Sequence, residues 1–133
     1  MTITVEVAGS DPLFEGWHEL VYVKDQIYTM KPDGKEVRRL TTTAFNDHAA
    51  SWSPDNERIA FSSDRDGNTE VYVMEAGGKN VRRLTRTRAT ERAAFWSPDG
   101  KRLAFSSDGD GPSEVYVMNA DGSSLRCLTR TSE

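Results

Sequence analysis

The sequence contains little of what most catalytic and metal sites require. It holds one cysteine, Cys127, and two histidines, His18 and His48, among 133 residues. One cysteine excludes an intrachain disulfide and a cysteine-based zinc site, so Cys127 is interpreted as a small strand residue. The motifs HExxH and G-x-S-x-G and a glycine-rich phosphate loop are all missing. We therefore expect no enzyme activity, no cofactor and no resident metal.

Strong charge and long apolar runs are also lacking. The net charge of −4 argues against nucleic acid as a partner. No apolar run approaches the length that crosses a bilayer, so membrane insertion is not expected. The first residues, MTITVEVAGSDPLFEG, lack the basic and apolar regions of a signal peptide. This predicts a cytoplasmic chain if residue 1 is the natural start, and predicts no compartment if the chain is an excised or mature piece.

What the sequence does contain is a repeat of 44 residues. Trp52 recurs as Trp96, and Phe61 recurs as Phe105. Three copies begin at Ile27, Val71 and Val115, and no insertion interrupts the phase after Ile27. A fixed period of this length is typical of propellers and solenoids.

Each repeat divides into four short runs with strand character. Taking the copy that begins in the middle of the chain, the runs are AASW, RIAFSS, EVYVM and NVRRLT. In the second run, apolar and small residues alternate, which is the period of a strand. Ser53-Pro54-Asp55-Asn56 and Gly77-Gly78 supply turn signals between runs. The pattern predicts an all-β fold of propeller blades, each with four antiparallel strands.

The stretches SPDGKRLAFSSD and EVYVMNADGSSLRCLT closely resemble the WD-repeat-like blades of the TolB family, and the likeness covers residues 27–133. The resemblance implies a six-bladed propeller that binds protein partners in the cell envelope without catalysis. An excised TolB-like piece would be periplasmic. Similar blades also occur as accessory propellers of peptidases.

The chain is expected to form one partial propeller over residues 1–133. Its predicted parts are a divergent first blade with an extra N-terminal strand (1–40), a second blade (41–84), a third blade (85–128) and a tail (129–133). The alternating run at residues 2–7 fits either the outer edge of a neighbouring blade, which we favour, or the inner strand of the first blade. Propellers close with about four to eight blades, so we expect a homodimer that completes a six-bladed ring. The rival interpretation is a fragment of a longer propeller.

Loops after the second and fourth strands of each blade are predicted to share one face of the ring. His48 and Arg92 occupy equivalent repeat positions just before the inner strand and are expected near the channel mouth. Together with Asp47, Arg88 and Glu91, they form the candidate ligand-binding rim.

The loop after the second strand also resembles a cation site in part. Asp64, Asp66, Asn68 and Glu70 supply oxygen donors around a glycine. The spacing departs from the twelve-residue calcium loop, and the next copy of the loop loses the asparagine donor. We therefore interpret this segment as a hairpin loop, with these four residues as weak metal candidates.

These observations predict a non-enzymatic scaffold that self-associates and binds a protein or peptide. Two alternatives stay open: a purely structural half-propeller without a ligand, and an accessory propeller of a peptidase. The arginine pairs Arg38-Arg39 and Arg82-Arg83 are interpreted as charges that protect the edge strands from pairing, rather than as a nucleic-acid stripe.

Overall fold

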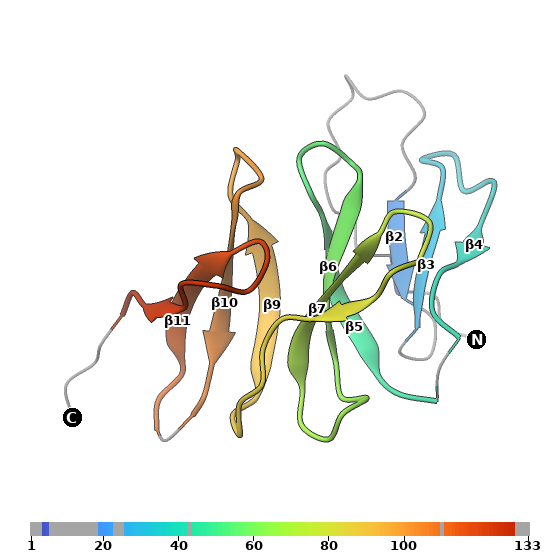
Figure 1. Ribbon diagram of the computed structural model, residues 1–133. Helices are drawn as coiled ribbons and strands as arrows, with labels where there is room; N and C mark the ends of the chain where they lie inside the picture. Colours follow the sequence, from blue (N-terminus) through green and yellow to red (C-terminus); the bar gives the residue numbers. More distant parts are fainter. Residues whose placement is uncertain (1–3, 6–18, 23–25, 43, 110, 130–133) are drawn as a thin grey trace.

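The computed structural model describes residues 4–5, 19–22, 26–42, 44–109 and 111–129, and side chains from residue 26 onward. Over these residues the chain forms three four-stranded antiparallel sheets that stand side by side (Figure 1). Every strand in a sheet pairs with its neighbour along the chain, which is the blade topology predicted from the repeat. In the described part of the chain, no helix has the length and apolarity needed to cross a membrane.

From β3 onward, the strands recur with the 44-residue period, whereas β2 departs from it. The first blade contains β1 (Thr4–Val5), β2 (Glu19–Tyr22), β3 (Ile27–Met30) and β4 (Arg38–Arg39). The second contains β5 (Asp47–Trp52), β6 (Arg58–Ser63), β7 (Glu70–Glu75) and β8 (Arg82–Arg83). The third contains β9 (Glu91–Trp96), β10 (Arg102–Ser107), β11 (Glu114–Asn119) and β12 (Arg126–Cys127). The fourth strands are therefore much shorter than the sequence runs suggest.

The N-terminal strand corrects one expectation. Thr4 lies opposite Tyr22, and Val5 lies opposite Val21, in the same sheet as the rest of the first blade. These residues thus form the first strand of that blade, and the favoured placement at the edge of a neighbouring blade is wrong. An alternating run specifies a strand but not its partner, so the sequence could not decide between the two. His18 lies outside the described residues.

The hairpin turns form as the turn residues require. Ser53 Oγ donates a hydrogen bond to Asp55 Oδ1 over 2.6 Å and accepts one from the Arg58 amide over 3.0 Å. Asn56 closes this turn with φ at 61°, a conformation that asparagine tolerates. The Ser97–Gly100 turn repeats the same bonds. The Ser53 and Ser97 hydroxyls lower the pKa of the Asp55 and Asp99 carboxyls.

Apolar cores lie between blades rather than within them. One cluster joins the first and second blades and contains Ile27, Ala50, Ile59, Phe61, Tyr72 and Met74. The other joins the second and third blades and contains Ala60, Val71, Ala94, Leu103, Phe105 and Met118. Alternation along β6 and β7 sends successive side chains to opposite cores, so the second blade is buried on both sides.

The first strands of the second and third blades each contain a bulge. Register shifts between His48 and Ser51 on β5, and opposite Ala104 and Ser106 on β9. Ala49 and Ala93 occupy the bulges with φ at 52° and 54°. A left-handed conformation is unfavourable for alanine because its Cβ approaches the backbone, whereas glycine adopts it freely.

This geometry predicts that Ala93→Gly stabilises the fold by about 0.5–1 kcal/mol, since the relief of strain outweighs the extra freedom of the unfolded chain. Urea denaturation followed by tryptophan fluorescence would measure the change. Ala94→Gly is the matched control and should destabilise the chain, because Ala94 is buried in the core between the second and third blades. Equal effects of the two variants would contradict the prediction.

Candidate functional site

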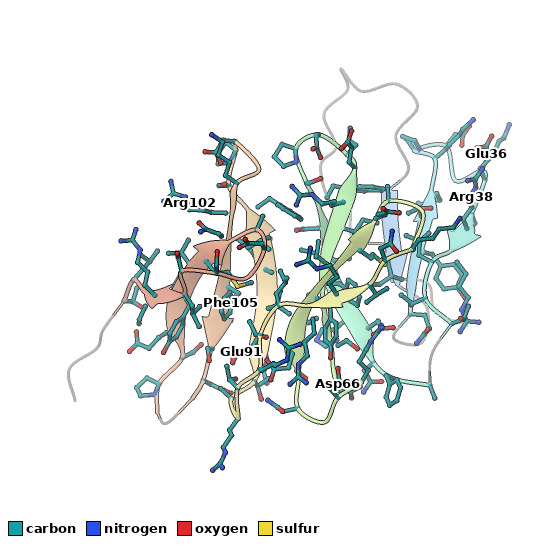
Figure 2. All side chains as sticks on the ribbon, viewed as in Figure 1. Glu36, Arg38, Asp66, Glu91, Arg102 and Phe105 are labelled. Carbon is teal, nitrogen blue, oxygen red and sulfur yellow. The ribbon has the colours of Figure 1, made fainter. Side chains whose placement is uncertain are left out.

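The loops after second and fourth strands meet at one end of the blades, which we call the loop face (residues 44–46, 64–69, 86–90 and 108–109). The Asp64 carboxylate accepts hydrogen bonds of 2.9 Å from the backbone amide and the side-chain amide of Asn46, and this contact, the Asp64 clamp, fixes the segment that leads into the second blade. Asp108 accepts the equivalent 3.0 Å bond from the Thr90 amide. In Figure 2 the loop face is at the bottom of the view, where Asp66 and Glu91 are labelled, and Arg102 lies toward the opposite end. The loop face is thus held by repeated contacts between loops, as a binding surface on a rigid scaffold requires.

His48 and Arg92 lie at equivalent positions near the loop face. Each is the second residue of its inner strand, and they face Ser62 and Ser106 across the sheet. Strands β5 and β9 are linked further along, where Ser51 Oγ donates to the Ala94 carbonyl over 3.0 Å. Arg92 is exposed and His48 is half-buried. Both residues are therefore accessible on neighbouring inner strands, and a rim role for them stays a prediction.

Asp47 is buried and belongs to an ion pair. Its side chain is fully inaccessible, and Arg65 Nη2 lies 2.9 Å from its Oδ1. Arg65 also donates from Nε to Ser63 Oγ over 2.9 Å, and its guanidinium lies over the rings of Phe61 and Tyr72. Sequence reasoning placed Asp47 on the rim but did not identify Arg65. The signal was the strand alternation, which turns Asp47 away from His48.

Glu91 occupies the same repeat position as Asp47 and is also fully buried. Thr87 and Ser107 hydroxyls donate to its Oε1, the latter over 3.1 Å. Its Oε2 is buried and has no hydrogen-bond partner among the described residues. Burial raises the pKa of the Glu91 carboxyl, and the nearby Glu70 and Asp108 charges act in the same direction.

A pocket of about 400 Å³ lies beside Glu91, lined by the connection after β8 and by residues of the third blade. The residues that line it include Arg88, Glu91, Phe105, Ser107, Gly109 and Tyr116. The structure therefore brings Arg88 and Glu91, two of the predicted rim residues, together at one pocket.

The four weak metal candidates are engaged by hydrogen-bond donors or ion pairs. Asp64 accepts from Asn46, Asp66 accepts from the Tyr72 hydroxyl, and the Asn68 amide donates to Glu70 over 3.2 Å. Glu70 also pairs with Arg83 at 3.2 Å. Across the described residues, no three His, Cys, Asp or Glu side chains are arranged to hold an ion.

The second arginine of each fourth-strand pair stabilises the fold. Arg39 Nε and Arg83 Nε donate to the carbonyls of Thr41 and Thr85, over 2.7 and 2.8 Å. Arg38, Arg39 and Arg82 are exposed, and Arg83 is half-buried. Cys127 takes the equivalent position in the third blade, where its thiol contacts the Thr129 carbonyl.

One serine lies opposite a histidine, which repeat spacing alone did not reveal. Ser62 pairs with His48 across β5 and β6. The Ser62 hydroxyl is fully buried and has no hydrogen-bond partner in the described part of the chain. An activated serine needs a hydrogen bond to its base, so this pair is not arranged as a nucleophile.

Antiparallel four-stranded sheets packed face to face, with polar loops gathered at one end, define a segment of a β-propeller. Residues 22–131 match the model of the TolB beta propeller domain, and the chain belongs to this family. No curated protein sequence matches it.

Solved structures agree with this assignment. The putative TolB from Agrobacterium tumefaciens shares 26% identity with a TM-score of 0.78, over 86% of this chain and 46% of that one. TolB from Acinetobacter baumannii shares 26% identity with a TM-score of 0.70, over 87% and 30% of the two chains. The tricorn protease shares the fold, with 21% identity, a TM-score of 0.61 and coverage of 92% and 11%. The chain thus spans less than half the length of these proteins.

The raised pKa of Glu91 predicts that Glu91→Gln increases the stability of the folded chain by an amount that depends on pH. The folded state holds this proton more tightly than the unfolded state, so wild-type stability from this group is lost as pH rises through the folded pKa. We expect Glu91→Gln to be more stable than wild type at pH 7.5, with the difference shrinking toward pH 4.5. Urea denaturation at several pH values tests this.

Exposed Glu57 on the opposite end provides the control, and Glu57→Gln should show no comparable pH-dependent difference. A stability gain for Glu91→Gln that grows as pH falls would refute this account of Glu91.

Proposed function

We propose that this chain is a non-enzymatic propeller scaffold that binds a protein or peptide partner on its loop face. The observation that carries the proposal is the pocket on this face beside the buried Glu91 carboxylate. The surrounding loops are fixed by the Asp64 and Asp108 clamps, so a partner would meet a preformed surface. Exposed Arg88 and Arg92 add positive charge around the pocket and the inner strands.

A second part of the proposal is that the outer face of the third blade packs against another blade. Val71 is fully buried in the second blade, whereas its repeat equivalent Val115 is 40% exposed. Leu84 packs in the core between the second and third blades, whereas its equivalent Leu128 is 54% exposed. The same apolar positions are thus covered in one blade and open in the next, and an open apolar face of this kind favours an interface.

Two sources can supply the covering blade. A second copy of the chain would bring the total to six blades in a homodimer, a number within the range that closes a ring. Blades from a longer chain would do the same, since the chain spans only part of the TolB structures it resembles.

An alternative function is that of an accessory propeller of a peptidase. The likeness to the tricorn protease favours this alternative, although that likeness shows the fold alone.

A peptide selection tests the binding function. Peptides selected from a random library on the immobilised chain should perturb amide signals of the loop face in NMR spectra. Arg92→Glu should weaken the selected peptides by about tenfold or more, because it reverses a charge at the expected contact. Lys101→Glu, an equal charge change at the opposite end, should leave binding unchanged. Signals that move only around Lys101 would refute the loop-face proposal.

Light scattering tests the covering blade. Self-association predicts a mass of twice 14.9 kDa at micromolar concentration. Val115→Asp should shift the chain to a monomer, because it places a charge in the apolar interface. Val37→Asp, an exposed valine of the first blade, should keep the dimer. A wild-type monomer at all concentrations would reject the homodimer in favour of blades from a longer chain.

A further inference from the structure

The second blade contains an arginine side chain surrounded by four residues of the same blade. Arg65 belongs to the loop after β6. Its guanidinium, which has only hydrogen-bond donors, pairs with the buried Asp47 carboxylate and donates to the Ser63 hydroxyl. The rings of Phe61 and Tyr72 lie 5.3 and 5.0 Å from its central carbon. A carboxylate, a hydroxyl and two aromatic faces together satisfy the charge and the flat shape of a guanidinium.

The third blade repeats this site without the arginine. Moving 44 residues along the chain replaces Asp47 by Glu91 and Arg65 by Gly109. The other walls keep their identity, since Ser63, Phe61 and Tyr72 become Ser107, Phe105 and Tyr116. The stacked ring pair is preserved as well, with centroids 5.9 Å apart in the third blade and 5.7 Å in the second.

The pocket of about 400 Å³ lies where the missing arginine would be. All four remaining walls, together with Gly109, line it. The Oε2 of Glu91 has no hydrogen-bond partner among the described residues and no accessible surface, so it accepts a further donor once the Glu91 side chain turns toward the pocket. Two differences between the copies distinguish this site, Asp47 against Glu91 and Arg65 against Gly109, and the second removes the side chain that fills it.

We propose that this pocket of the third blade, which we call the arginine slot, binds an arginine side chain of a partner peptide or protein. This inference rests on the proposed binding function and names the group that the loop face recognises. The guanidinium would pair with Glu91, donate to Ser107 and lie against Phe105 and Tyr116. Its planar fork of donors fits a carboxylate beside a hydroxyl better than the compact ammonium of lysine does.

Other charged side chains near the pocket affect whether a cation binds there and which cation it is. Glu70 and Asp108 add negative potential around Glu91, which favours a cation. Arg88 lines the pocket but makes no ion pair with Glu91 in the described part of the chain. Arg88 is therefore the one lining side chain that could occupy the slot from within, and the experiment has to separate it from a ligand.

An NMR titration with N-acetyl-arginine-N-methylamide tests the proposal. We expect saturable shifts at Ser107 and Gly109. The citrulline analogue has nearly the same shape without the charge and should bind at least about tenfold more weakly, since charged hydrogen bonds are the stronger ones. Glu91→Gln should weaken arginine binding by a similar factor. Equal binding of arginine and citrulline would overturn the proposal.

Gly109→Arg gives the sharpest variant, because it restores the residue of the second blade. Gly109 has room for a side chain, as a Cβ there would meet only the Ala89 Cβ at 3.9 Å. The new arginine should fill the slot, raise the melting temperature and abolish binding of the probe. Gly109→Ala is the matched control and should keep both values near wild type. Probe binding that survives in a folded Gly109→Arg variant would place the ligand elsewhere and reject the slot.

The remaining outcomes distinguish this inference from the proposed function. Probe binding that is absent in wild type but present in Arg88→Ala would show that Arg88 fills the slot, which overturns the proposal for the native chain. If selected peptides map to the loop face while the arginine probe fails on wild type, the slot is rejected and the scaffold function stands. If neither binds, both are rejected.

Discussion

Each blade depends on one polar side chain that fastens its fourth strand. Glu70 begins β7 in the second blade, and the Thr85 hydroxyl donates to it while accepting from the Val71 amide over 2.9 Å. Gln26 with Thr41, and Glu114 with Thr129, repeat the link in the other blades. Fourth strands of two residues make few ladder bonds, so this link adds to the backbone pairing that they do make. It also fixes where the chain leaves one blade and enters the next, and hence where the loop face lies.

The fold was largely predictable because the repeat contains the same structural signals in three copies. The turn residues, the strand alternation and the period each predict the same blade, and the structure confirms them. The length of the fourth strands was overestimated: of the run NVRRLT, only Arg82–Arg83 form a strand, and Thr85 bonds to the Val71 amide through its side chain. The position of β1 required knowledge of its partner, which no local pattern contains.

The candidate site remains a prediction, and the surroundings of its residues could not be read from the sequence. Equivalent repeat positions placed His48 and Arg92 near the same end of the blades. Strand alternation turns Asp47 away from His48, but the repeat could not reveal its partner, because Arg65 is not repeated in the third blade. The signal for the pocket was nevertheless present in the sequence. Aligning the loops shows Gly109 where Arg65 stands, and only the three-dimensional contacts of Arg65 make that difference meaningful.

The threonine link has a consequence for how such a chain can change in length. Its donor and acceptor partners lie 15 residues apart in sequence and recur every 44 residues without a gap. Gain or loss of one whole blade leaves every link intact, whereas an insertion between the third and fourth strands lengthens the 15-residue segment that the link closes. The architecture can therefore grow or shrink by entire blades without losing a link, while substitutions such as the one that distinguishes Arg65 from Gly109 make the copies different.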